Sequence, residues 1–591
     1  MLDSSNDERR AYELFCTPLG VQIDAINDDV SENYDDSWNA IWGFDAIRSY
    51  PRDFRHHIGA FARDRAKNSY LSQTIKLKGM TGASPGHNLE LIPTITASRS
   101  DARESLDAPN FTNGDVDADV GLSVRWGIFP NMSLNGAIHP DFSQVEADAL
   151  QLAENEQFAL YFRETRPFFL EGAGYFSTDL RLVHTRAIAK PSGAGKPTGK
   201  QGKHTRAVFT ARDGVTNLIV PGLESSASGQ FDVDNTSSAA RYRMDFGPNS
   251  FAGVTVTDRR AEDYSNSVFS ADTVHRWTQK DKFNASAAIS NTEYSNEMIS
   301  QLGASEGSVS DPAVYLAYNH SERGWWFFSE LNQLGTDYRS DLGFQPNVGL
   351  RSVWAGGAKV WWGEDGDMIQ RKAWGSSYSR GDPVDGGMLE ESFDTWANAN
   401  LPWQTYIDAR ASTGRRWFDG EMFDIWDLGA GVESQLTGDL SLSFDGRMGD
   451  WIDFANSRRG QRHVLNSSLG YTFGRHLNLQ LSHIFSAMNV GGERLFTIHA
   501  PQLRAVHQFN SRAFVRLILQ YTGVNRDPSL YADAVDDETQ SLLTQLLFTY
   551  KVNPKTALYA GYGDNQFGDD EFGLTHTDRA FFMELGYARV R

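Results

Sequence analysis

The residues best suited to chemistry lie between His139 and Gly172, where carboxylates and guanidinium groups are interleaved with aromatic side chains. The motif HPDFSQVEAD begins this stretch and the motif YFRETRPFFLEG ends it. Charged groups so close to aromatic residues can be buried only if the charges pair with one another. The members of this charge cluster are Asp141, Glu146, Asp148, Arg163, Glu164, Arg166 and Glu171.

These carboxylates could bind calcium, hydrolyse a glycoside or form structural ion pairs. Asp141, Glu146 and Asp148 offer the oxygen ligands that Ca²⁺ prefers, but their spacing is not that of a calcium loop. A glycosidase needs two carboxylates about 5 to 10 Å apart across a cleft, and arginines accompany Glu164 and Glu171 in the sequence. We therefore predict an ion-paired plug or clasp, with no catalytic residue and no metal assigned.

Composition excludes several classes of protein. The net charge of -21 would repel a polyanion, and no long run of Lys or Arg is present, so nucleic acid is not an expected partner. The single Cys16 cannot form an internal disulfide framework. The chain has no HExxH, phosphate-loop or nucleophile-elbow motif, so we expect no cofactor.

The elements that position the charge cluster follow from hydropathy that alternates with a period of two residues. Residues 241–246 and 251–257 alternate on either side of Gly247-Pro248-Asn249-Ser250, which predicts a β-hairpin with one apolar and one polar face. The same pattern recurs along the chain. In the segment 514–521 it predicts that one set of side chains faces lipid and the set between them faces a lumen. The lipid-facing set is Val515, Leu517, Leu519 and Tyr521, and the lumen-facing set includes Arg516 and Gln520.

Connections between these segments alternate between tight turns and long polar stretches such as 335–349, 450–461 and 522–540. Short turns at one end and long loops at the other are typical of an outer-membrane barrel. We therefore predict an all-β fold: a large antiparallel transmembrane β-barrel of roughly 22 to 26 strands over residues 81–591. Residues 143–178 lack strand alternation, so we expect them inside the lumen as a plug. Aromatic pairs such as Trp325-Trp326 are expected in the interfacial girdles rather than in sugar-stacking platforms, with only one ring of each pair facing lipid.

Four blocks of the sequence resemble a known family in the family's order: Trp42 to Arg65, Asn88 to Ala97, Pro140 to Asp148 and Arg166 to Thr178. They are similar to a bacterial outer-membrane β-barrel family of unknown function that normally follows a carbohydrate-binding family 9-like module. The resemblance implies a barrel with a periplasmic β-sandwich. It supplies no catalytic residues, although such proteins are often labelled hydrolases. Residues 1–80 match only the last part of the module, so we expect a truncated β-sandwich remnant there.

The function expected from these patterns is a non-enzymatic outer-membrane barrel that handles glycans or another nutrient at the envelope, as a plugged channel or as a binding platform. An envelope hydrolase acting on O-glycosidic bonds and a secretion or assembly scaffold stay open as alternatives. Expected partners are outer-membrane lipid, the outer-membrane assembly machinery and, as candidate ligands, glycans. Residues 1–10 have no apolar core, so no signal peptide is recognised in this chain, and we expect that its start is truncated.

Overall fold

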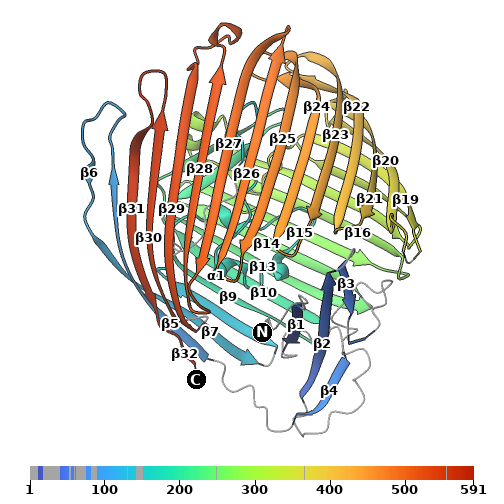
Figure 1. Ribbon diagram of the computed structural model, residues 1–591, viewed down its shortest axis with the longest axis vertical. Helices are drawn as coiled ribbons and strands as arrows, with labels where there is room; N and C mark the ends of the chain where they lie inside the picture. The colour runs from blue at the N-terminus through green and yellow to red at the C-terminus, as the bar shows by residue number, and fades with distance from the viewer. Residues whose placement is uncertain are drawn as a thin grey trace.

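A computed structural model gives the fold of the chain (Figure 1). The structure describes residues 11–17, 40–51, 55–58, 60–61, 75–80, 89–129, 131–140, 151–247, 249–364, 366–553 and 556–590. Among these residues, twenty-four strands pair into one closed antiparallel barrel, as predicted. Each strand pairs with the next along the chain, and β31 pairs with β5 to close the wall. Figure 1 shows this closure, with β5 in blue near β31 in red.

The wall strands are β5 (Leu89–Ala102), β7 (Asp117–Phe129), β8 (Met132–Ile138), β9 (Pro191–Gln201), β10 (His204–Asp213), β13 (Asn235–Gly247), β14 (Ser250–Ala261), β15 (Tyr264–His275), β16 (Asp281–Glu293), β17 (Ser308–Ser321), β18 (Trp325–Leu334), β19 (Leu350–Trp362), β20 (Arg371–Pro383), β21 (Glu390–Leu401), β22 (Thr405–Phe418), β23 (Glu421–Gln435), β24 (Leu440–Asp453), β25 (Arg458–Phe473), β26 (Leu477–Val490), β27 (Glu493–Gln508), β28 (Ala513–Arg526), β29 (Glu538–Asn553), β30 (Thr556–Gly568) and β31 (Thr575–Gly586). Two short strands, β6 (Thr112–Asn113) and β32 (Arg589–Val590), extend the pairing of β5.

Each wall strand has one apolar outer face and one inner face, because successive side chains point to opposite sides of a strand. In β10 the residues at 205, 207, 209, 211 and 213 are buried, whereas Val208 between them is 46% exposed. The predicted hairpin is formed by β13 and β14, and its Tyr242, Met244 and Phe246 lie on the exposed outer face. This outward apolar band is the surface that a barrel presents to outer-membrane lipid.

The register predicted for residues 514–521 agrees with the contacts of β28. Arg516 donates to Gln545 and Gln520 accepts from Gln502, so both point to the inner face. Leu517 is paired with Leu546, which is 41% exposed on the outer face.

Part of an aromatic girdle lies on the outer face near the short turns between β15 and β18. The rings of Trp277 and Tyr318 stack at 5.7 Å, and those of Trp325 and Phe327 stack at 5.5 Å. Trp325 is 39% exposed, as expected for a residue at the lipid boundary. Trp326 is the next residue in β18 and faces inward.

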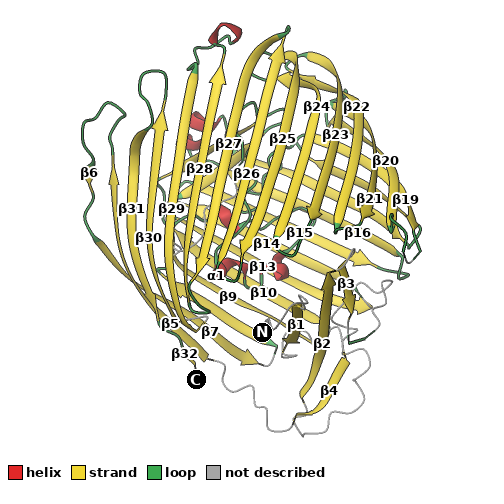
Figure 2. Ribbon diagram, in the orientation of Figure 1, coloured by secondary structure: helices red, strands yellow, loops and turns green. Residues whose placement is uncertain are grey.

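The two ends of the barrel differ in the length of their connections. One end carries short turns, such as 202–203 between β9 and β10. The other end carries long loops that contain the hairpin of β11 (Thr216–Pro221) and β12 (Ser226–Phe231), the helix α2 (Asn296–Leu302), residues 335–349 and η6 (Pro528–Leu530). The predicted long segment 450–461 is wrong, because β24 and β25 extend into it and leave only residues 454–457 between them. Figure 2 shows how little of the chain is helical.

Residues before the barrel form a separate sheet of four strands: β1 (Ala11–Thr17), β2 (Ala40–Pro51), β3 (Arg55–Ile58) and β4 (Ile75–Met80). All the pairings are antiparallel, with β2 at the centre. The assignment of residues 1–80 to a carbohydrate-binding module stays a prediction. Within the described residues, no helix is long and apolar enough to cross a membrane.

Candidate functional site at the inner segment

The connection from β8 to β9 leaves the wall after Ile138 and returns at Pro191. We call its described part, residues 151–190, the inner segment. It contacts strands on widely separated parts of the closed wall, from β28 and β24 to β9 and β10, so the wall face that it touches is the inner face.

The first part of the inner segment is held by strands β24 to β28. Leu152 packs against a buried cluster that includes Met488 and Phe496. Arg526, the last residue of β28, donates two hydrogen bonds to the Glu154 carboxylate at 3.1 and 2.7 Å. Asn155 donates to the carbonyl oxygen of residue 452 and accepts from the backbone of residue 454. These contacts join the inner segment to the loop end of the wall.

The next residues bring the inner segment to a second strand and to a loop. Arg416 of β22 donates to the Gln157 side chain at 2.6 Å. The backbone of Gln157 accepts from Ser226 of β12, and the Ser226 hydroxyl accepts from the Ala159 backbone at 2.7 Å. The hairpin of β11 and β12 is therefore tied to the inner segment.

A buried ion pair shapes the turn before the helix α1 (Pro167–Leu170). Arg166 donates to both oxygens of Glu164, at 2.8 and 2.7 Å, and also to the carbonyl oxygens of Thr185 and Ile188. The guanidinium carbon lies 4.3 Å from the ring centroid of Phe169. Burial opposes ionisation of Glu164, but the hydrogen bonds from Arg166 and Thr185 outweigh it and hold the pKa of this carboxyl below its usual value. Pro167 suits the first helical position because proline fixes φ near the helical value and lacks an N–H.

The other members of the predicted charge cluster have different places. Glu171 pairs with Arg125 of β7 at 3.1 Å, and each of these side chains is 43% exposed. Arg163 is exposed. Asp141, Glu146 and Asp148 lie outside the described residues.

Two lumen-facing arginines near the inner segment have partners of their own on the wall. Arg241 makes a buried pair with Asp272 at 2.7 Å, and Arg243 pairs with Asp245 at 3.1 Å. Glu164 is paired with Arg166 and Glu171 with Arg125 instead. Sequence spacing could not identify Arg125, because it lies 46 residues before Glu171 and is brought near by strand pairing.

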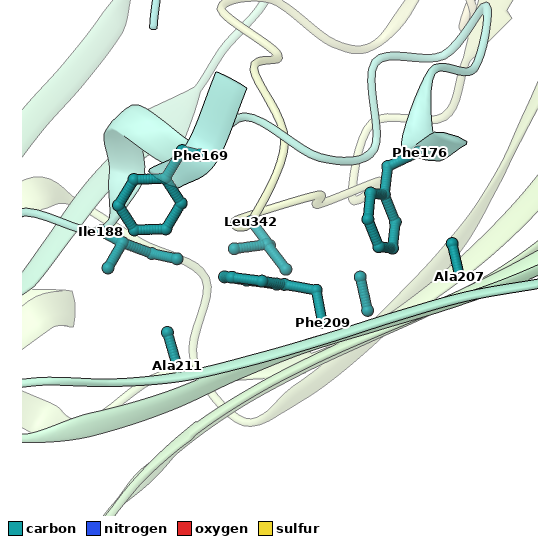
Figure 3. Packing of buried hydrophobic residues seen from close by; sticks show 8 residues of the cluster. Phe169, Phe176, Ile188, Ala207, Phe209, Ala211 and Leu342 are labelled. Carbon is teal, nitrogen blue, oxygen red and sulfur yellow. The ribbon is translucent and has the colours of Figure 1, made fainter. Parts of the chain in front are cut away.

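The second half of the inner segment forms a hydrophobic core with β10. Figure 3 shows Phe169, Phe176, Ile188 and Leu342 gathered around Phe209, whose ring rises from the inner face of the wall. The Phe169 and Phe209 rings meet at a centroid distance of 6.0 Å and an interplanar angle of 67°. Edge-to-face contact of this kind is a favourable aromatic geometry.

A long loop, residues 335–349, folds onto the inner segment. The backbone of His184 donates to Leu342, and that of Phe344 donates to Arg181. The loop is anchored by Asp341, whose carboxylate accepts from Tyr264 at 2.7 Å and from Tyr294 at 3.2 Å. Burial raises the pKa of Asp341. The sequence predicted a polar loop for residues 335–349, but this stretch also contains apolar residues such as Leu342 and Phe344. These apolar residues were the signal that the loop packs inward.

A cavity of about 410 Å³ lies between the inner segment, the hairpin of β11 and β12, and this loop. Its lining mixes apolar and polar groups, a composition common in small-molecule sites. The residues contributed by the inner segment are Leu160, Phe162, His184, Arg186 and Ala187. The hairpin contributes Asn217, Leu218 and Gln230 to the lining, and the loop contributes Phe344 and Gln345.

His184 lies among aromatic and cationic groups beside this cavity. Its ring centroid lies 5.0 Å from that of Tyr161 and 5.4 Å from that of Phe344. Burial lowers the pKa of His184 to about 4; Glu164 opposes this shift, and nearby arginines reinforce it. The imidazole is therefore neutral near pH 7. Within the described residues, no group of three or more His, Cys, Asp or Glu side chains is arranged to hold a metal ion.

Residues 86–219 match a family described as "Domain of unknown function (DUF5916)". Among solved structures, the chain is similar to the copper transporter OprC, with a TM-score of 0.44 and 8% identity over 92% of this chain and 86% of that one. It is also similar to the siderophore receptor PirA of Pseudomonas aeruginosa, with a TM-score of 0.43 and 8% identity over 84% and 80% of the two chains. No curated protein matches the sequence.

Proposed function

We propose that this protein is a non-enzymatic outer-membrane barrel that binds a nutrient at its loop end, with residues 143–178 acting as a plug. The observation that carries the proposal is the path of the inner segment, whose described residues connect Arg526 of β28 with Lys196 of β9. A barrel of this size has a lumen that wall side chains alone cannot fill. A segment fixed to separated parts of the wall can obstruct such a lumen.

The cavity supports a binding role at the same place. Its volume of about 410 Å³ lies within the range of small-molecule sites, which run from roughly 300 to 1,000 Å³. The cavity borders the plug, so a bound solute would contact the segment whose movement opens the pore. Phe162 and Phe344 offer ring faces, while Arg186 and Gln230 offer hydrogen-bond donors. Glycans are one ligand class that fits this mixture of ring faces and hydrogen-bonding groups.

Hydrolysis of O-glycosidic bonds fits the inner segment less well. Both oxygens of Glu164 accept hydrogen bonds from Arg166, so this carboxylate is held ionised by a fixed partner and is a poor general acid. Glu171 is paired with Arg125.

The alternative function as a secretion or assembly scaffold predicts that no pore opens when the inner segment is removed.

The decisive experiment measures single-channel conductance in planar bilayers. The test variant replaces residues 152–188 by a short Gly-Ser linker, and the control variant replaces residues 104–110, in the loop between β5 and β6, by a linker of matched length. Heat-modifiable migration on a gel checks that each barrel has folded. We expect large, steady conductance only from the test variant. A folded test barrel that conducts no better than the control would refute the plug.

A further inference from the structure

The inner face of strands β18 to β21 carries a row of aromatic side chains away from the inner segment. Leu334 identifies this face, because it packs against Leu180 and Leu182 of the segment. Trp326 and Phe328 lie on the same face of β18 as Leu334, since side chains two residues apart share a face. The neighbouring Trp325 belongs to the outer girdle. An aromatic pair that looks uniform in the sequence is therefore divided between lipid and lumen.

The pairing register places two tryptophans on either side of two small residues. Trp326 is paired with Ala358, Ala358 with Gly375, and Gly375 with Trp396. Strands β18 and β21 are separated by three inter-strand spacings, roughly 14 Å. The two indole centroids are nevertheless only 6.2 Å apart, with an interplanar angle of 25°. The rings therefore lean toward each other across the small residues, with their planes nearly parallel, and we call this pair and the rings beside it the floor.

Gly375 is required for this arrangement. A Cβ atom at position 375 would lie 2.5 Å from Cζ2 and 2.6 Å from Cε2 of Trp396. Both distances are shorter than real Cβ contacts, so any larger residue must displace the indole. The Trp396 ring therefore lies directly over the backbone of β20.

Further rings extend the floor along the wall. The ring of Phe328 stacks beside Trp326 at 5.9 Å, and Trp354 meets Phe328 edge-to-face at 4.4 Å. Trp354 is 46% exposed although it lies on the inner face. A large ring exposed inside a barrel has no lipid to contact, so its free surface is available to a solute.

Charged groups beside the floor indicate what kind of solute fits. Arg410 of β22 is paired with Trp396, and its guanidinium lies between Asp445 at 2.5 Å and Asp408 at 3.7 Å. Asp394 shares the face of Trp396 on β21. Arg447 lies in the same row beyond Gly429 and pairs with Asp427 at 3.6 Å. These carboxylates outnumber the two guanidinium groups, and the excess negative charge disfavours an anionic ligand. They can still accept hydrogen bonds from hydroxyl groups, and Arg410 can donate them.

We infer that the row of Trp326 and Trp396, with Phe328 and Trp354 beside it, is a stacking site on the barrel wall for a neutral chain of pyranose sugars. Sugar rings present flat faces of C–H groups to the indoles, while their hydroxyl groups reach the pairs around Arg410. The inference rests on the proposed function only in requiring that solute enters the lumen, and it names the ligand class.

The test is calorimetric titration of the intact, detergent-solubilised protein with maltohexaose and, separately, with cellohexaose. Trp326→Ala and Trp396→Ala are the test variants. Trp325→Ala is the matched control, because it removes the same ring one residue away on the outer face. We expect each test variant to weaken binding about tenfold, as the loss of one stacked ring implies. The control should stay within about twofold of the parent protein.

Gly375→Val provides a second variant that retains every aromatic ring. It should weaken binding as much as Trp396→Ala does, because it displaces the indole. Heat-modifiable migration shows whether each variant is folded. If Gly375→Val does not fold, the comparison of Trp326→Ala with Trp325→Ala decides the test.

Two results would overturn the inference: neither sugar binds the parent protein at millimolar concentration, or Trp325→Ala and Trp326→Ala weaken binding equally. Tighter binding of the anionic aromatic 2,3-dihydroxybenzoate than of either sugar would also overturn the ligand class. These outcomes are independent of whether removal of the plug opens a pore, so failure here is distinguishable from failure of the plug proposal.

Discussion

Removal of Arg166 should loosen the internal structure of the inner segment, because this side chain connects three parts of the segment. It is 5% exposed, forms a two-point contact with Glu164, and donates to the carbonyl oxygens of Thr185 and Ile188. Arg166→Met keeps the apolar stem but leaves the Glu164 carboxylate buried without its cation. Breaking a buried ion pair in this way costs about 3 to 5 kcal/mol.

Hydrogen exchange read by mass spectrometry measures this cost locally. A loss of about 3 to 5 kcal/mol corresponds to roughly 10²-fold to 4 × 10³-fold faster exchange for amides of residues 164–190, if they exchange by opening of the segment. Strand amides of β28 should be unaffected. Arg163→Met is the matched control, since Arg163 is exposed three positions earlier, and its exchange should change less than about threefold.

The double variant Glu164→Gln with Arg166→Met separates charge from packing. It removes both charges, so exchange should return most of the way toward that of the parent protein. The reasoning would be refuted if Arg166→Met left exchange unchanged. It would also be refuted if exchange in the double variant were as fast as the summed free-energy costs of Glu164→Gln and Arg166→Met predict.

Three further predictions concern the wall and the segment. Leu517→Arg should destabilise the barrel by about 2 to 4 kcal/mol in a refolding titration, and Gln520→Arg on the inner face should cost much less; equal costs would show that the register of β28 is wrong. The pKa of His184 is about 4 in the folded protein, below its ordinary value of 6.5, so the unfolded segment takes up the proton first. The stabilisation by neutral His184 is complete above pH 6.5 and is lost as the pH falls toward 4, an effect on the order of 3 kcal/mol. Hydrogen exchange at pH 7.5 and 5, corrected for intrinsic rates, should show this loss in the parent but not in His184→Phe. Arg526→Ala should free the first part of the segment, giving faster exchange at residues 152–158 and brief conducting events; no change in either would contradict the anchoring role of Glu154.

The sequence by itself determined the parts of this protein that depend on a two-residue period. Alternation in segments such as 241–257 and 514–521 identified strands, their faces and the barrel, because one side of each strand must suit lipid and the other a polar lumen. It also indicated that charges near Glu164 must pair, since isolated buried charges are too costly. Arg166, two residues away, is a partner that local spacing could suggest.

Only the tertiary structure decided which distant residues meet. Glu171 finds Arg125 because Lys196 of β9 holds the Glu171 carbonyl oxygen and β9 and β7 lie on either side of β8 in the wall. Trp326 finds Trp396 because three strand registers align them. The local sequence around Trp325 and Trp326 contains two identical rings, and it cannot say which of them faces lipid. That choice depends on the phase of β18 within the closed barrel, which is fixed by pairing with neighbouring strands and by packing of Leu334 against the inner segment.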